Sequence, residues 1–350
     1  MKRKFIPFAK IGQYNQTVRA VVQRARYAGK DTNGDAIYDS TAEIPTITFK
    51  GSTKLHGTNA GVVMNRAGDM WAQSRSHPIT VEHDNCGFAF FVQKNEGVFH
   101  EMFASLSFED ADYVAIFGEW CGGNIQKGVA ICELSKRFVV FDVKMAYDEV
   151  VASEDGEATA SRYLTDDKWQ HLKSVENAIY NILDFPTWTI DIDFNHPAQA
   201  QNELVEITDR IEAECPVGKA FDVSGCGEGA VWKANMSDMT HRFKVKGKKH
   251  SASKVKTIAP VDPERLKNVM DFVEYAVTEN RLNQGIEQVF TTNGLELDIK
   301  KLGDFLNWVR SDIFAEELDA LIASNLTPKD VGKDIATAAR IWFMKKWSVV

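Results

Sequence analysis

The chain has 350 residues, of which 44% are hydrophobic and 26% are charged, and its formal net charge is -8. This length can bury a sizeable core and commonly forms two domains. No apolar run approaches the roughly 20 residues of a membrane-spanning helix, and Pro7 and Lys10 interrupt the N-terminal segment where a signal peptide needs an apolar core. The five cysteines include no C-x-x-C pair, which argues against a zinc ribbon or a disulfide framework. We therefore expect a reduced, cytoplasmic protein with no membrane partner.

Basic residues gather in one segment despite the acidic total. Seven lysines and arginines, and no carboxylate, lie between His241 and Lys256. A segment with this density of one charge sign creates a positive potential that suits an anionic ligand.

The spacing of apolar residues predicts a β-rich region that extends to about residue 257. Apolar residues three or four positions apart indicate helices, and strict alternation indicates strands. The expected helices cover 13–26, 88–106 with a break near Gly97, 166–182 and 202–214, and a turn-rich loop is expected at 29–35. The expected strands are a β-meander over 44–76 that contains Lys54, and then 113–120, 137–143, 225–233 and 241–246.

The pattern changes at Pro260. Asp262 can cap a helix whose first residue is Pro263, and helical spacing continues to Val350, including residues 303–324 and a last helix that starts at Thr327. We expect a boundary near residues 257–262, with domains at 1–257 and 258–350. The expected fold class is α+β, with antiparallel sheets and flanking helices in the first domain and an all-α second domain.

Lys54 is the residue around which the first domain is organised. It lies in Thr53-Lys54-Leu55-His56-Gly57-Thr58-Asn59, between two strand-like segments. An amine attacks only when it is deprotonated, so a nucleophilic lysine needs a lowered pKa, which burial or nearby cations supply. Lys244 and Lys246 would be such cations if the fold brought them close. The alternative is an ordinary lysine at the end of a strand.

Two carboxylates occupy similar settings elsewhere in this domain. Glu119 ends an apolar strand, and Glu228 lies between Gly227 and Gly229. A carboxylate at the end of a buried strand is costly unless it is paired or bound to a metal, and two such residues could hold Mg²⁺. The alternatives are a structural salt bridge for Glu119 and a solvated turn for Glu228.

Lys244 and Lys246 share one face of an alternating strand, because side chains alternate with a period of two. Two ammonium groups about 7 Å apart suit a polyphosphate. The alternative is a solvated edge strand whose lysines prevent aggregation.

The order of these segments resembles the covalent nucleotidyltransferases, which include DNA ligases, RNA ligases and mRNA capping enzymes. The Lys54 segment looks like motif I, Phe117-Gly118-Glu119 like motif III, Glu228-Gly229-Ala230-Val231 like motif IV, and Lys244-Val245-Lys246 like motif V. His56 and the following Gly-Thr-Asn are similar to the RNA ligase 2 family, and so are Ser74-Arg75-Ser76 and the stretch from Phe138 to Asp142. Helices, rather than the short β segments of an OB-fold, follow motif V, as in that family.

The resemblance implies a role for each matching residue. Lys54 would attack the α-phosphate of ATP, release pyrophosphate and form lysyl-AMP. Its neighbours would lie beside the nucleotide: Thr53, Leu55, His56 and Asn59.

The other implied contacts come from the later motifs. Arg75 would contact the ribose or phosphate, Glu119 the ribose hydroxyls, and Phe141 would stack on adenine. Glu228 would assist metal binding, with Mg²⁺ or Mn²⁺ as the cofactor, while Lys244 and Lys246 would neutralise the phosphates.

These features together are interpreted as an ATP-dependent RNA ligase that seals 5′-phosphate and 3′-hydroxyl ends of RNA. We expect nicked duplex RNA as its substrate and RNA repair as its task, and we expect the protein to be a monomer. The alternatives are a ligase that acts mainly on DNA, a GTP-using capping enzyme, a catalytically silent protein that binds RNA ends, and a helical protein-interaction module with an incidental β domain. Incubation with labelled ATP and Mg²⁺ should give an adenylated protein that Lys54→Ala cannot form, and no label transfer with ATP at any metal would contradict this interpretation.

Overall fold

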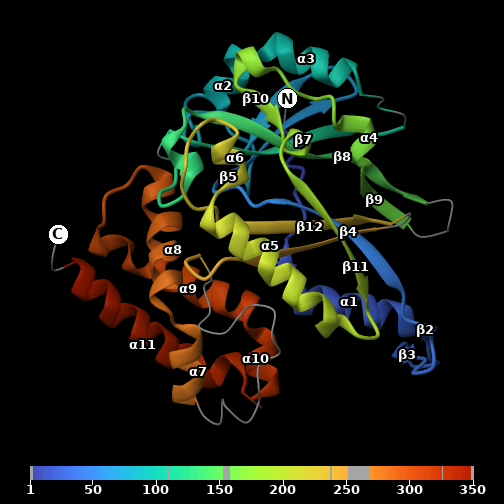
Figure 1. Cartoon of the computed structure of the whole chain (residues 1–350), viewed down its shortest axis with the longest axis vertical. Helices are drawn as coiled ribbons and strands as arrows, with labels where there is room; N and C mark the ends of the chain where they lie inside the picture. Colours follow the sequence, from blue (N-terminus) through green and yellow to red (C-terminus); the bar gives the residue numbers. More distant parts are fainter. Residues whose placement is uncertain are drawn as a thin grey trace.

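The computed structural model of the chain contains two large β-sheets with flanking helices, a two-stranded hairpin and a group of C-terminal helices (Figure 1). It describes residues 3–106, 108, 110–123, 125–152, 158–236, 239–250, 269–324 and 326–347. The predicted α+β class is confirmed.

The first sheet has five strands in the order β1 (Gly12–Gln13), β13 (Thr240–Lys246), β12 (Gly229–Asn235), β4 (Thr46–Thr53) and β11 (Thr187–Asp193). Only the β1–β13 pair among them is parallel. Two of the predicted helices contact this sheet: α1 (Tyr14–Arg26) and α5 (Gln201–Ala213). Ile47 and Phe49 alternate into the shared core, and the Trp232 ring lies so close to Gly51 that a Cβ there would be 2.7 Å from it.

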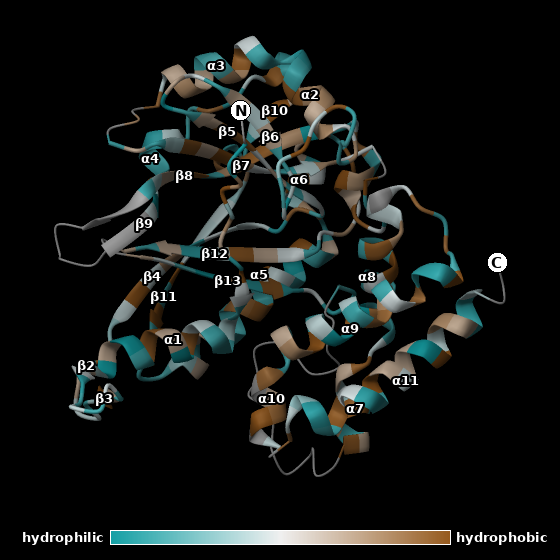
Figure 2. Cartoon of the chain, turned by 180° about the vertical axis from the view of Figure 1, so that it is seen from behind, coloured by the Kyte–Doolittle hydropathy of each residue, from teal (hydrophilic) through white to brown (hydrophobic). Residues whose placement is uncertain are grey.

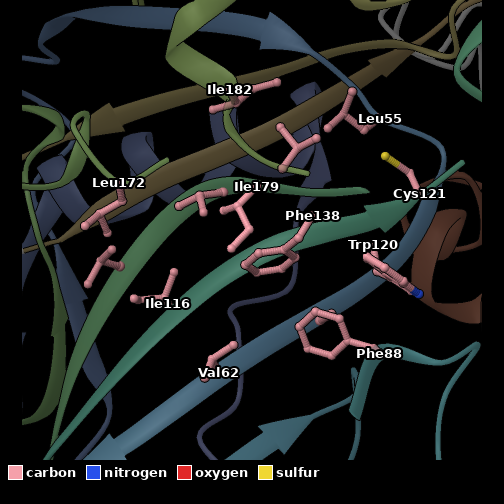
Figure 3. Packing of buried hydrophobic residues seen from close by; sticks show 14 of the residues in the cluster. Leu55, Val62, Phe88, Ile116, Trp120, Cys121, Phe138, Leu172, Ile179 and Ile182 are labelled. Atoms are coloured by element: carbon pink, nitrogen blue, oxygen red, sulfur yellow. The ribbon is translucent and has the colours of Figure 1, made fainter. Parts of the chain in front are cut away.

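The second sheet follows the order β10 (Ile179–Asn181), β8 (Arg137–Ala152), β7 (Tyr113–Cys121), β5 (Gly57–Asn65) and β6 (Met70–Gln73), with β9 (Ala158–Tyr163) paired to β8. The β10–β8 pair is parallel. Helices α2 (Phe88–Lys94) and α3 (Glu96–Ala104) supply aromatic side chains to its core. Phe88 packs against Trp120 and Phe138, with ring centroids 5.6 and 5.0 Å away (Figure 3).

The predicted β-meander over 44–76 is wrong, although its three strands are present. β4 belongs to the first sheet, whereas β5 and β6 belong to the second. Lys54, Leu55 and His56 therefore form the crossing between the two sheets. Alternation within each strand cannot reveal this, because β4 buries one face in either arrangement and residues 60–64 of β5 are buried on both faces.

The C-terminal helices are α7 (Val269–Ala276), α8 (Glu279–Val289), α9 (Leu302–Glu316), α10 (Leu318–Ala323) and α11 (Pro328–Trp347). They form a core of their own around Phe305, Val309 and Phe343. No helix in the described part of the chain is both long and apolar enough to cross a membrane. The predicted domain boundary at 257–262, with its cap at Asp262, lies outside the described residues.

Three predicted helices differ in detail. The pair at 88–106 breaks at Asn95 rather than at Gly97, and the segment 303–324 forms two helices that meet at Glu317. The predicted helix 166–182 is wrong: α4 covers only Asp166–Trp169, and the end of the segment forms β10. Tertiary pairing of β10 with β8 outweighs the helical spacing there.

Part of the predicted loop at 29–35 is a hairpin instead. β2 (Tyr27–Lys30) pairs with β3 (Ala36–Tyr38), and Asp31 caps the turn between them. The hairpin lies at one end of α1, far from the C-terminal helices α8 and α11 (Figure 2).

Candidate nucleotidyl-transfer site

The segment that carries Lys54 is held at both ends. The Lys54 backbone amide donates to the carbonyl of Gly229 at 2.8 Å, and Leu55 is buried in the core of the second sheet. Gly57 is required where β5 meets β7, since a Cβ there would lie 2.4 Å from the Trp120 carbonyl oxygen. The Gly57 amide is then free to donate to Oε1 of Glu119 at 2.9 Å.

Glu228 is the hub of the charged residues. Its Oε2 accepts from Lys54 Nζ at 2.6 Å and contacts His56 Nδ1 at 3.0 Å, while its Oε1 lies 3.1 Å from Lys246 Nζ. Burial alone raises the pKa of this carboxyl, but Lys54, Lys246 and His56 outweigh burial and hold the pKa well below its usual value. Glu228 is therefore an anion among three cationic partners.

His56 is held between two carboxylates. Its Nδ1 faces Glu228, and its Nε2 lies 3.5 Å from Oε1 of Glu287 on α8. Burial lowers the pKa of the imidazole, but Glu228 and Glu287 together raise it to about 9. His56 is thus an imidazolium at neutral pH.

The pKa of Glu119 is shifted in the opposite direction to that of Glu228. Burial raises its pKa to about 7, against the opposing charge of Lys54 and with the help of the nearby Glu228 anion. It can exist in both protonation states near neutral pH, so it can accept a hydrogen bond or donate one.

Lys244 and Lys246 come from β13 and face the site as the alternation predicted. Lys246 pairs with Glu228, and Lys244 lies 2.9 Å from Glu316 on α9. Burial lowers the pKa of Lys244, whereas the Glu228 charge outweighs burial and raises that of Lys246. The strand therefore supplies two cations with different partners.

A cavity of about 450 Å³ opens in front of Lys54. Eight of the eleven predicted site residues line it: Thr53, Lys54, Leu55, Asn59, Arg75, Glu119, Phe141 and Lys244. The other three predicted residues do not line the cavity: His56, Glu228 and Lys246. Glu228 contacts the lining residue Lys54, and His56 and Lys246 contact Glu228. The structure thus brings the predicted set together.

The lining of the cavity also includes charged residues that sequence reasoning missed. Asp166 binds Lys50 at 3.1 Å and Lys233 at 2.7 Å, and Asp142 binds Arg242 at 2.6 Å. Asp142 directly follows Phe141, so its position in the motif was a usable signal. Asp166 carried none, because its segment had the spacing of a long helix.

Two other regions of the chain also reach the cavity without a sequence signal. Phe8 and Ile11 of the N-terminal segment line it, and Phe8 packs edge-on against Phe141 with ring centroids 5.1 Å apart. Asp312 and Glu316 approach from α9. Both regions are remote in sequence from every motif, so only the folded chain shows their contribution.

Among the described residues, no group of three or more His, Cys, Asp or Glu side chains could hold a metal ion by itself. Both oxygens of Glu228 face cations in this arrangement. The metal role of Glu228 stays a prediction.

Residues 48–246, more than half of the chain, match the RNA ligase family. The chain belongs to the RNA ligase family. The resemblance inferred from the motif order is confirmed at this level. No protein in the curated set matched the chain.

Solved structures similar to this RNA ligase family member include two other ligases. An RNA ligase of Naegleria gruberi with pyrophosphate is 16% identical, with a TM-score of 0.42, and the match covers 69% of this chain and 57% of that chain. An archaeal ATP-dependent RNA ligase is 13% identical, with a TM-score of 0.38, and the match covers 91% of this chain and 65% of that chain. The chain therefore spans less than two thirds of the length of either of these ligases.

Proposed function

We propose that the protein is an ATP-dependent RNA ligase that joins 3′-hydroxyl and 5′-phosphate ends through lysyl-AMP and adenylylated RNA. One observation carries the proposal: Lys54 lines the same cavity as Glu119, Phe141 and Lys244, although these residues come from four separate segments. Such convergence is what a covalent nucleotidyl transfer needs.

In the first step, the Lys54 ammonium group would lose a proton to solvent, and the resulting amine would form a bond to the α-phosphorus of ATP while the bond to pyrophosphate breaks. The nitrogen would then release a second proton to solvent, which leaves lysyl-AMP. Glu228 positions the amine at the cavity wall through the 2.6 Å contact. Glu228 is a weak base because its pKa is held well below the usual value, so its role is positioning and charge balance.

The remaining residues would position the nucleotide and offset its charge. Phosphoryl transfer depends mainly on alignment and on neutralising charge. Phe141 would stack on adenine, and Glu119 would bond the ribose hydroxyls. Lys244, Lys246 and Arg75 would face the phosphates.

A divalent cation, Mg²⁺ or Mn²⁺, would supply additional charge neutralisation when bound. Its ligands would include nucleotide phosphate oxygens and water, because Mg²⁺ commonly binds through substrate phosphates and few carboxylates. Glu228 contacts Lys54 and Lys246 in this structure. It would assist in binding the cation after nucleotide binding rearranges these two ion pairs.

The later steps would transfer AMP to an RNA 5′-phosphate and then displace it with a 3′-hydroxyl. The AMP provides a good leaving group for this displacement. We propose that the substrate is nicked duplex RNA and that the protein acts as a monomer in cytoplasmic RNA repair. Residues 1–257 would form the adenylyltransferase domain, and residues 258–350 would form a helical domain that contacts RNA ends.

The test is incubation with labelled ATP and Mg²⁺. We expect a labelled protein that Lys54→Ala cannot form, whereas Lys219→Ala, which removes an exposed lysine paired with Glu214, should label normally. No label transfer in the wild type would refute the enzyme and favour a silent RNA-end-binding protein. Labelling with GTP instead of ATP would identify a capping enzyme, and faster sealing of nicked DNA than nicked RNA would identify a DNA ligase.

A further inference from the structure

The lysines and arginines that line the cavity differ in whether a carboxylate neutralises them. Five of them lie between 2.6 and 3.1 Å from a carboxylate oxygen, in the pairs Lys50–Asp166, Lys54–Glu228, Lys233–Asp166, Arg242–Asp142 and Lys244–Glu316. The other two are Lys10 and Arg75, and neither has a carboxylate partner in the part of the chain that the structure describes. The cavity therefore holds two cations that an anionic ligand can use without breaking an ion pair.

Lys10 belongs to an N-terminal segment that side chains of the second sheet hold in place. Lys144 of β8 donates to the Pro7 carbonyl at 2.9 Å, and the Ala9 amide donates to the Tyr163 hydroxyl of β9 at 2.8 Å. Two residues beyond Lys10, the segment continues as β1, which pairs with β13. The backbone is thus fixed on both sides of Lys10, while its side chain is exposed.

Arg75 contacts the same segment. Its guanidinium donates to the Phe8 carbonyl at 3.5 Å, two residues before Lys10, and its side chain is also exposed. Phe8 in turn packs against Phe141, the residue proposed to stack on the base. The fold therefore joins Lys10, which lies outside every motif segment, to a motif arginine at the wall of the cavity.

The second step of the proposed reaction brings a second phosphate group into this cavity. The RNA 5′-phosphate must approach the AMP on Lys54, so the site must then balance the charges of two phosphate groups. A terminal phosphate carries about 1.5 to 2 negative charges at pH 7, whereas a phosphodiester of the strand carries about one. Two cations without carboxylate partners match the charge of a terminal phosphate, and their exposure suits a ligand that is attached to a polymer.

We propose that Lys10 is a binding residue for the 5′-phosphate of the RNA strand, which it holds together with Arg75. The inference rests on the proposed function for the identity of the strand, and it adds a residue from a segment that no motif covers. Lys10 takes no part in bond formation, since its role is to stabilise the bound phosphate through charge-assisted hydrogen bonds.

The test uses the full-length protein and two nicked RNA duplexes that differ only in a phosphate or a hydroxyl at the 5′ end of the nick. Affinities are measured by fluorescence anisotropy without nucleotide or divalent metal, so that no AMP is transferred. The quantity compared is the preference for the phosphorylated nick, because a ratio cancels any general loss of RNA binding.

We expect Lys10→Ala to lower this preference by about fivefold to tenfold, and Lys10→Arg, which keeps the charge, to retain most of it. Lys30→Ala is the matched control, since it removes an exposed lysine of the β2–β3 hairpin that does not line the cavity.

No preference in the wild type, or an unchanged preference in Lys10→Ala, would overturn the inference. An equal loss of affinity for both duplexes would do the same, because it would assign Lys10 to the strand backbone. ATP binding by the same variants tests the other source of phosphate: a preference that stays while ATP affinity falls would assign Lys10 to the nucleotide instead. Label transfer from ATP decides the proposed function separately, so a wild type that does not label but prefers the phosphorylated nick through Lys10 refutes the enzyme and supports the phosphate site.

Discussion

Replacing His56 with asparagine removes an imidazolium that two carboxylates stabilise. Asparagine can keep a hydrogen bond to Glu228, which lies 3.0 Å from His56 Nδ1, but it cannot carry a charge. The variant therefore isolates the electrostatic part of the interaction, and its effect on stability should depend on pH.

The magnitude follows from the pKa of His56, which Glu228 and Glu287 raise from 6.5 to about 9 against the effect of burial. One pKa unit corresponds to about 1.4 kcal/mol, so the charged form contributes about 3 kcal/mol to the free energy of unfolding. Because the folded pKa is the higher one, this contribution is fully present below pH 6.5 and is lost as the pH rises through about 9. The wild type should exceed His56→Asn in stability by about 3 kcal/mol near pH 6 and by little near pH 10.

The assay is urea unfolding of both proteins at several pH values across this range. Lys144, with a pKa of about 8, titrates in both proteins, so the difference between the two curves is the quantity to use. Glu119 contributes to that difference as well, because the His56 charge lowers its pKa of about 7 and is absent from the variant. His100→Asn serves as the control, because His100 is exposed and lies 3.8 Å from Glu96. A wild-type advantage over His56→Asn that is constant with pH, or that grows toward pH 10, would refute the reasoning.

Two further predictions concern the free energy of unfolding and are measured in the same way. Gly57→Ala should lower it by roughly 2 kcal/mol or more, because the new Cβ would lie 2.4 Å from the Trp120 carbonyl oxygen. Gly97→Ala has open space around it and should be neutral or slightly stabilising, so equal stabilities of the two variants would show that β5 can move away from β7. Arg281→Leu should lower the free energy of unfolding by about 3–5 kcal/mol, because it leaves the carboxylates of Asp312 and Glu317 without their cation. Arg310→Leu, on the surface of α9, should change it little. A stable Arg281→Leu protein would mean that those two carboxylates bind water or become neutral.

The helices and strands that form from local spacing were predictable. The alternation in β13 placed Lys244 and Lys246 on one face, and eight of the eleven predicted site residues line the cavity, although they are a minority of its lining. The sequence offered Lys244 and Lys246 as cations that would lower the pKa of Lys54 if the fold brought them close. The structure pairs Lys54 with the Glu228 carboxylate, 2.6 Å away. Lys54 directly follows β4 and Glu228 directly precedes β12, so their contact depends on the pairing of these two strands, which the spacing of residues does not contain.

The sequence by itself determined the chemistry available to this protein: an isolated lysine, two carboxylates in glycine-rich settings and a paired-lysine strand, in the order typical of RNA ligases. Only the tertiary structure decided that β4 and β5 belong to different sheets, so that Lys54 lies at the crossing between them. It also brought Glu316 to Lys244, although the two residues are separated by 72 positions. Local periodicity arises from backbone geometry and is visible in one segment, whereas such contacts depend on how complete elements pack.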